Sequence, residues 1–267
     1  WLPPRDRVSH KWNNAVRVIA GSAGMGGAAS LVSMAAMRAG AGMVHLSWRA
    51  GDASFNVPTE VVGKVLPTEN WAAFIGQDVQ WFQSLVIGPG LGRGDDVGVQ
   101  VRSVLAYDIS MVIDGDGLSA AVDPTGKLDT LTARTAPTVL TPHDGEFAVL
   151  GGDAGSPDRI GATKALAART GCTIVRKGPT TIICSPDGQV YLVASGDERL
   201  ATAGTGDVLA GIIGAFLARG LAAPEAAAAG AFIHGMAGSS LPTEGAIARD
   251  VVALISDVLS EVMSDVC

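Results

Sequence analysis

The chain has 267 residues, a net charge of -7 and 35 glycines, whereas aromatic residues make up only 5%. The acidic balance, without any basic cluster, argues against nucleic acid as a partner. No uninterrupted apolar run approaches the ~20 residues that cross a bilayer, so no membrane association is expected.

Cysteine usage bears on the compartment. The three cysteines, Cys172, Cys184 and Cys267, form no CxxC pair. Such usage is typical of a reducing compartment and predicts neither a disulfide framework nor a metal site. We therefore expect a cytoplasmic protein.

Apolar runs alternate with Ala-rich helical runs over the first two thirds of the chain. Taken in chain order, the pattern predicts a strand over 16–20, a helix over 27–40, strands over 43–48 and 84–88, a helix over 95–107, strands over 111–114 and 138–141, a helix over 158–170 and a strand over 173–177. The strands are apolar without alternation, as is typical of strands buried on both faces. Strand–helix–strand repetition predicts an α/β fold with a mostly parallel sheet and helices on both faces.

The rhythm changes late in the chain. Two β-runs around Pro-Asp-Gly predict a hairpin over 180–193. Three helices are then predicted over 205–219, 223–240 and 246–263. Because there is no linker, charge run or internal repeat, we expect a single domain over 1–267.

Ligands of open parallel sheets bind at the carboxyl ends of the strands, and the turn after 16–20 is the first candidate. Its GMGGAA segment, 24–29, fits the G-x-G-x-x-A pattern of dinucleotide binding. However, Trp48 and Arg49 stand where the acidic residue of that pattern is needed, and Asp52 comes late. The glycines either allow only a tight turn or leave room for a ligand beside Ala28.

The next two turns are equally open to interpretation. Gly-Pro-Gly-Leu-Gly, 88–92, forms a corner with exposed N–H groups that either faces a phosphate or sugar or serves only as a turn. Asp114 and Asp116 end a strand and could bind a metal ion or hydroxyl groups. Equally, Asp116 could simply begin the next helix, where acidic side chains are favoured.

The turn after 138–141 contains a histidine. Thr141-Pro142 suits a helix start, and Glu146 falls in the first turn of that helix. His143 is then either a satisfied structural group or a ligand-binding residue.

The segment LATAGTGDVLAG, 200–211, predicts an anion site. Helix starts carry free N–H groups and a partial positive charge, and Ala203-Gly204-Thr205-Gly206 would wrap these groups around a phosphate. Asp207 would lie beside the anion, either stabilising the helix or acting as general base for a substrate hydroxyl. Lys177, at the end of a strand, either neutralises nucleotide phosphate or is solvated.

These turns, in this order, resemble the ADP- or ATP-dependent NAD(P)H-hydrate dehydratase family of the ribokinase-like superfamily. The similarity runs from about His10 to about Gly238. It rests on HK, GSAGMGGAASLVSMAAMRAGAG, IGPGLG, IDGDGLS, TPHDGEF, KGPTT followed by PDG, LATAGTGDVLAGIIGAFLARG and FIHGMAG.

The resemblance implies a three-layer ribokinase-like fold and a repair reaction. Hydrated nicotinamide, in NADHX or NADPHX, is phosphorylated on its ring hydroxyl by ADP or ATP, and phosphate then leaves to restore NADH or NADPH. Mg²⁺ would bridge the nucleotide phosphates, with no metal ligand expected from the protein. The dinucleotide is then a substrate, and the first turn need not be a dinucleotide-cofactor site.

The resemblance also implies site residues. Asp207 would be the catalytic base and would contact the hydrate together with Ala28, Gly90 and His143. The nucleotide would be bound by Lys177, Gly178, Pro179, Thr180, Thr181, Gly204, Thr205 and Gly206.

The chain departs from the family pattern in several places. GDERLATAG, with Asp197, Glu198 and Arg199, replaces an Asn-Pro-Gly-like step, and Gly115, Gly117 and Ser119 replace Ala, Ala and Asn. The resemblance further implies a homo-oligomer and a functional link, by fusion or otherwise, to an NAD(P)H-hydrate epimerase.

Two alternatives stay open on sequence alone. A ribokinase-like kinase for a small hydroxylated substrate would keep GTGD but would not need TPHxGEF together with GPGLG. A nucleotide-binding sensor would have no use for the carboxylate of Asp207.

Overall fold

The computed structural model describes residues 2–3, 7–49 and 57–264. These residues build one nine-stranded sheet in the order β3-β2-β1-β4-β5-β6-β7-β8-β9. The strands are β1 (Ala15–Ile19), β2 (Met43–Arg49), β3 (Val62–Leu66), β4 (Ser84–Ile87), β5 (Ser110–Ile113), β6 (Thr138–Leu140), β7 (Thr173–Arg176), β8 (Thr181–Cys184) and β9 (Val190–Val193).

All strand pairs from β3 to β7 are parallel, and β8 and β9 continue the sheet in antiparallel fashion. The expected hairpin over 180–193 is thus confirmed, and so is the mostly parallel sheet. The edge strand β3 was not expected, because four of its five side chains are exposed or only half-buried and it lacks a strong apolar run.

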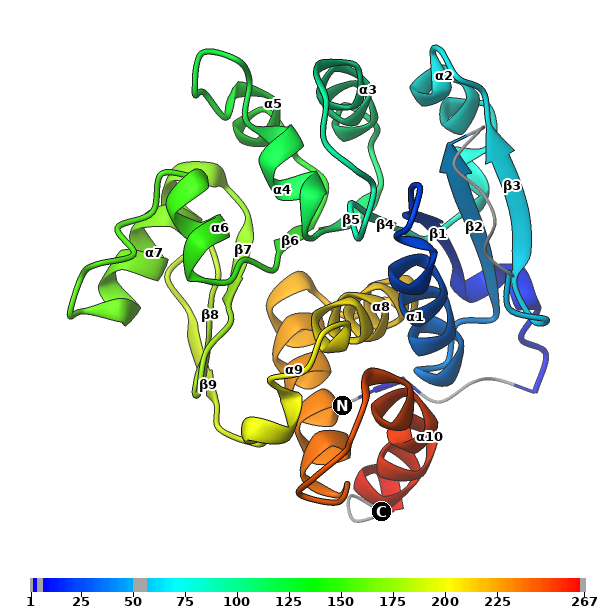
Figure 1. Ribbon diagram of the computed structural model, residues 1–267, viewed down its shortest axis with the longest axis vertical. Helices are drawn as coiled ribbons and strands as arrows, with labels where there is room; N and C mark the ends of the chain where they lie inside the picture. Colours follow the sequence, from blue (N-terminus) through cyan, green and yellow to red (C-terminus); the bar gives the residue numbers. More distant parts are fainter. Residues whose placement is uncertain (1, 4–6, 50–56, 265–267) are drawn as a thin grey trace.

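Two helical layers cover the sheet (Figure 1). On one face lie α1 (Gly26–Arg38), α8 (Thr205–Ala218), α9 (Ala223–Ser239) and α10 (Ala248–Ser264). On the other lie α2 (Trp71–Gly76), α3 (Asp95–Leu105), α4 (Asp116–Ala121), α5 (Asp129–Thr132), α6 (Asp144–Val149) and α7 (Arg159–Thr170). The three-layer α/β fold predicted from the sequence is therefore confirmed.

The strands serve both layers. In β1, Val16 and Val18 pack into the core beneath α1 and α8, whereas Ala15 and Ile19 pack into the opposite core. Every residue of β1 is buried, which explains its apolar run without alternation.

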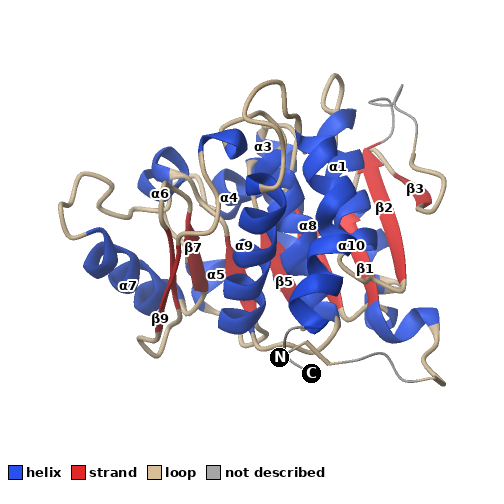
Figure 2. Ribbon diagram, turned by 90° about the horizontal axis from the view of Figure 1, so that it is seen from below, coloured by secondary structure: helices blue, strands red, loops and turns tan. Residues whose placement is uncertain are grey.

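Helix α8 is the central element of its layer, and Figure 2 shows it between α1 and α9 in front of the strands. Residues 208–218 of α8 are all buried. Gly211 lies against the backbone of α1 at Val32, and Gly214 lies against Val86 of β4. The absence of side chains at these two positions lets α8 approach both neighbours closely, and this packing fixes where the helix begins.

We expect Gly211→Ala to destabilise the protein although alanine favours helices. The new methyl group would overlap the carbonyl oxygen of Val32, which belongs to packed backbone. Overpacking of this kind costs about 1–3 kcal/mol, so the melting temperature should fall by several degrees.

Gly27→Ala in α1 is the matched control, because a methyl group there has no neighbour within 4 Å. Equal melting temperatures for the two variants in thermal denaturation would contradict the close approach of α8 to α1.

Candidate active site

The turns singled out by the sequence meet along one edge of the sheet. Successive backbone hydrogen bonds join them: Gly21 N to Pro89 O at 2.9 Å, Asp114 N to Ile87 O at 3.1 Å, Thr141 N to Ile113 O at 3.2 Å and Lys177 N to Pro142 O at 2.9 Å. Parallel strands place their carboxyl ends at the same edge, so the turns form one continuous rim.

The first and second turns are in direct contact. A Cβ on Gly90 would lie 3.1 Å from the Cβ of Ala28 and 2.9 Å from that of Met25. Gly90 also has a φ of 58°, which glycine adopts without strain. Ala28 and Gly90, both predicted to contact the hydrate, therefore lie side by side.

His143 is the N-cap residue of α6. Its Nδ1 accepts hydrogen bonds from the backbone N–H groups of Gly145 and Glu146, at 3.0 and 3.3 Å. The Glu146 carboxylate accepts in return from the His143 backbone N–H at 2.9 Å. The ring is nevertheless 61% exposed, so one edge of it remains accessible while Nδ1 has a structural role.

The start of α6 is also held by two arginines. Asp144 accepts from Arg159 Nη1 and from the fully buried Arg176 Nε, each at 2.8 Å. Hydrogen bonding by Arg159 is the main reason that the pKa of Asp144 is lowered. Because Arg176 directly precedes Lys177, this ion-pair network connects the turn that contains His143 to the turn that contains Lys177.

Helix α8 begins at this rim without a side-chain cap. Its N-cap residue, Gly204, has a φ of 93°, a left-handed conformation that glycine adopts readily. The uncapped first turn leaves backbone N–H groups available to an anion. The Nζ atom of Lys177 lies 3.5 Å from the position of a Cβ on Gly206, so a cation stands beside this helix start.

A charged cluster surrounds the start of α8. Lys177 Nζ lies 3.1 Å from Asp114 Oδ1 and 3.7 Å from Glu146 Oε2. Burial opposes the charge of Lys177, but Asp114 and Glu146 outweigh it and raise the pKa of the ammonium group. Lys177 therefore stays protonated and is not a solvated surface lysine.

Asp207 has the properties of a base near neutral pH. Burial, followed by repulsion from Asp114, raises the pKa of Asp207 to about 7, against the opposing attraction of Lys177. A carboxylate tuned in this way can take a proton at physiological pH, which a fully solvated aspartate does poorly.

A cavity of about 630 Å³ opens beside the start of α8. Six of the residues predicted to bind nucleotide line it: Lys177, Gly178, Pro179, Thr181, Thr205 and Gly206. Thr180 and Gly204 are not among the described residues that line it. The cavity is large enough for a nucleoside diphosphate.

Asp197 and Glu198, which the sequence placed near the phosphate site as departures from the family pattern, line this cavity. The sequence interpretation missed Ser195 and, from α9, His234, which line it as well. Burial lowers the pKa of His234 to about 4, so the ring is neutral. The FIHGMAG segment was the available signal, but its position facing α8 depends on the packing of α9.

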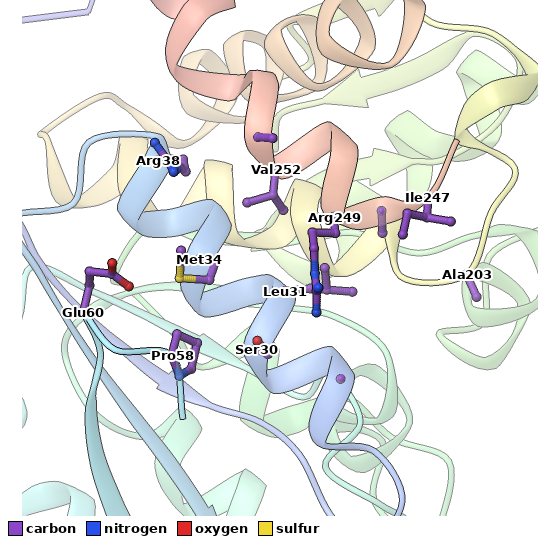
Figure 3. Close-up of a pocket in the computed structure, with 13 residues that line it drawn as sticks. Ser30, Leu31, Met34, Arg38, Pro58, Glu60, Ala203, Ile247, Arg249 and Val252 are labelled. Atoms are coloured by element: carbon purple, nitrogen blue, oxygen red, sulfur yellow. The ribbon is translucent and has the colours of Figure 1, made fainter. Parts of the chain in front are cut away.

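A second cavity, of about 680 Å³, lies between α1 and α10 (Figure 3). Leu31, Met34 and Val252 form its apolar part, and Arg38 and Arg249 lie along it. None of the site residues implied by the family resemblance lines it, but Gly27 of the first turn and Ala203 of the predicted anion turn do.

The comparison with known families decides the assignment. The NAD(P)H-hydrate dehydratase family matches residues 16–260. The chain belongs to this family. The membership favours the dehydratase over the kinase alternative.

Individual relatives agree with this assignment. The chain is 40% identical to the bifunctional NAD(P)H-hydrate repair enzyme of Mycobacterium tuberculosis, over 85% of this chain and 46% of the relative. It is 36% identical to the ADP-dependent (S)-NAD(P)H-hydrate dehydratase of Neisseria meningitidis, over 93% of this chain and 84% of the relative. The chain thus spans about half the length of the bifunctional relatives it matches.

A solved dehydratase has the same fold. The ADP/ATP-dependent NAD(P)H-hydrate dehydratase of Bacillus subtilis, co-crystallised with ATP and Mg²⁺, superimposes with a TM-score of 0.81 at 28% identity. The match covers 97% of this chain and 94% of that one.

We expect Asp207→Asn to stabilise this dehydratase-family protein increasingly as pH rises. The folded carboxyl has a pKa of about 7, whereas the unfolded one has a pKa of ~3.9. The folded state therefore binds the extra proton, and native stability is lost as pH rises from the unfolded pKa through the folded pKa. Asparagine abolishes this loss, so the difference in melting temperature should widen from pH 5 to pH 8.

Asp95→Asn provides the control, because Asp95 is an exposed acid in the first turn of α3. A difference for Asp207→Asn that stays constant between pH 5 and pH 8 would show that the folded environment does not raise this pKa.

Proposed function

We propose that the protein dehydrates NADHX and NADPHX to NADH and NADPH at the expense of ADP or ATP. Family membership supports the reaction class. The observation that carries the proposal for this chain is Asp207, a carboxyl group with a pKa of about 7 that lies at an uncapped helix start near the half-buried, ion-paired ammonium group of Lys177.

The nucleotide occupies the 630 Å³ cavity, with its phosphates toward Lys177 and Gly206. Backbone N–H groups of the first turn of α8 hold the transferred phosphoryl group, and Lys177 offsets its charge. Asp207 takes the proton of the ring hydroxyl as that oxygen attacks the terminal phosphorus, whose bond to the bridging oxygen breaks so that AMP leaves from ADP, or ADP from ATP. Because the base and the phosphate are held together, proton removal and phosphoryl transfer can occur in one bound complex.

Magnesium neutralises nucleotide phosphates in reactions of this class. In the described part of the chain, no group of three His, Cys, Asp or Glu side chains could hold a metal ion.

The hydrate lies against the contact between Ala28 and Gly90, with the exposed edge of His143 as a further contact. After phosphorylation the C–O bond breaks and phosphate leaves with the bonding electrons, while the ring nitrogen lone pair forms a C=N bond. Loss of a proton from the adjacent ring carbon to a base then forms the ring C=C bond and returns the electron pair to nitrogen. Because the nitrogen expels the phosphate, departure of the phosphate needs little further acid catalysis.

The remaining proposals concern the whole protein. We propose one catalytic domain over 1–267, a homo-oligomer, a cytoplasmic location and action alongside an NAD(P)H-hydrate epimerase. Among the described residues, no helix is long and apolar enough to cross a membrane.

We expect the protein to convert NADHX to NADH and free phosphate when ADP or ATP and Mg²⁺ are present. The absorbance of the reduced nicotinamide measures the rate. kcat/KM should fall about tenfold per pH unit below an apparent pKa of about 7, because Asp207 must be deprotonated to act. Accumulation of a stable phosphorylated substrate would instead indicate a kinase.

Asp207→Asn should abolish turnover while leaving nucleotide affinity within a few-fold, since the amide keeps the shape of the side chain but cannot take a proton. Asp95→Asn is again the control. Comparable kcat values for Asp207→Asn and the native protein would remove the base from this position.

His143→Ala should raise KM for the hydrate more than KM for the nucleotide, because His143 does not line the nucleotide cavity. The capping hydrogen bonds are lost as well, so His143→Asn, which keeps an N-cap acceptor, separates the two roles. A larger increase in KM for the nucleotide than for the hydrate would show that the hydrate does not bind beside His143.

A further inference from the structure

Asp114 is a buried carboxylate at the end of β5 that the proposed reaction does not yet use. Its residue is 2% exposed. One oxygen, Oδ1, accepts hydrogen bonds from Thr141 Oγ1 at 2.6 Å and from Lys177 Nζ at 3.1 Å. A charge this deeply buried is stable only when it is paired, and the ammonium group is its only cationic partner among the described residues.

The backbone around Asp114 leaves it little freedom. Its N–H donates to Ile87 O and its carbonyl oxygen accepts from Gly117 N, each at 3.1 Å. Gly88 packs directly against the same carbonyl group, so even a methyl group there would overlap it. Asp114 is thus a fixed point, whereas the lysine chain that it binds is long and flexible.

We propose that Asp114 is a positioning residue that holds the ammonium group of Lys177 at the start of α8, where the phosphoryl group must pass. The inference deepens the proposed function and rests on it. Lysine carries large rotamer freedom, and holding its ammonium group in advance removes that cost from nucleotide binding. Thr141 donates to the same oxygen, Oδ1, and so restrains the carboxylate to which Lys177 binds.

The same placement affects the base. The charged groups that act on Asp207 are Asp114, Lys177, Asp116 and Glu146, and Asp114 is the strongest of them. Loss of the Asp114 charge removes a like charge that disfavours ionisation of Asp207. A released Lys177 would move toward the remaining carboxylates, Asp207 included, and both changes lower the pKa of Asp207.

Asp116 offers a matched control two residues away. Its carboxylate accepts from Gly92 N at 3.0 Å and from Arg93 Nε at 2.8 Å. It therefore belongs to the same turn and carries the same charge, but its hydrogen bonds hold the second turn and not Lys177.

The test compares Asp114→Asn with Asp116→Asn in NADHX turnover with ADP and Mg²⁺. Asp114→Asn should raise KM for the nucleotide by tenfold or more and move the acid limb of kcat/KM downward by about 1 pH unit. Asp116→Asn should change the nucleotide KM less than threefold and move the limb less. Carbon-13 NMR titration of the Asp207 carboxyl group in Asp114→Asn, in the absence of substrate, should show its pKa lowered by the same amount.

Thr141→Val keeps the charge of Asp114 but removes its second donor, and it serves if Asp114→Asn does not fold. It should raise the nucleotide KM a few-fold with the acid limb unmoved. A fall in kcat for Asp114→Asn with unchanged nucleotide KM and unchanged pH profile would overturn the proposal. An increased Mg²⁺ requirement with an unmoved limb would also overturn it, because Asp114 would then act through the metal ion.

Calorimetric binding of ADP with Mg²⁺ separates this inference from the proposed function. If the native protein does not convert NADHX, yet Asp114→Asn weakens ADP binding and Asp116→Asn does not, the positioning role stands and the dehydratase proposal fails. Equal ADP affinities for native protein and Asp114→Asn would overturn the positioning role whatever the turnover.

Discussion

The half-buried ammonium group of Lys177 is the constraint on which the site depends. Carboxylates from two turns, Asp114 and Glu146, lie within 4 Å of it, and Asp207 follows in the first turn of α8. Without this cation, like charges in a partly buried site would strongly disfavour full ionisation. With it, one carboxylate stays paired while Asp207 remains close to its titration point. Ion pairing with Lys177 and repulsion between the carboxylates together thus set the acid–base chemistry at this edge of the sheet.

The fold fixes both the Asp114–Lys177 ion pair and the helix that carries Asp207. Asp114 and Lys177 are 63 residues apart in sequence, and they meet because β5, β6 and β7 are consecutive parallel strands. The helix that carries Asp207 belongs to the opposite layer and is fixed by the close approach of α8 to α1 and β4. Core packing therefore controls the distance between the base and the cation.

Much of the fold could be predicted because its signals are local. The buried strands are continuous apolar runs, and the Pro-Asp-Gly turn marks the β8–β9 hairpin. The signal failed at β3, where exposed positions hide an edge strand, and at α2, a short helix whose N-cap Asn70 makes no side-chain capping bond. In both cases the element is stabilised by packing against its neighbours, so its own sequence lacks the long apolar pattern that would predict it.

The sequence by itself determined the α/β class and the succession of glycine turns, and it predicted an anion site at the start of α8, because these follow from residue order and local conformation. Only the tertiary structure decided which side chains of these turns lie together. It placed Asp114 against Lys177 and Asp116 against Arg93, and it gave the Nδ1 atom of His143 a capping role. It also determined the ionisation of Asp207, since a pKa depends on burial and on charges that distant segments bring together.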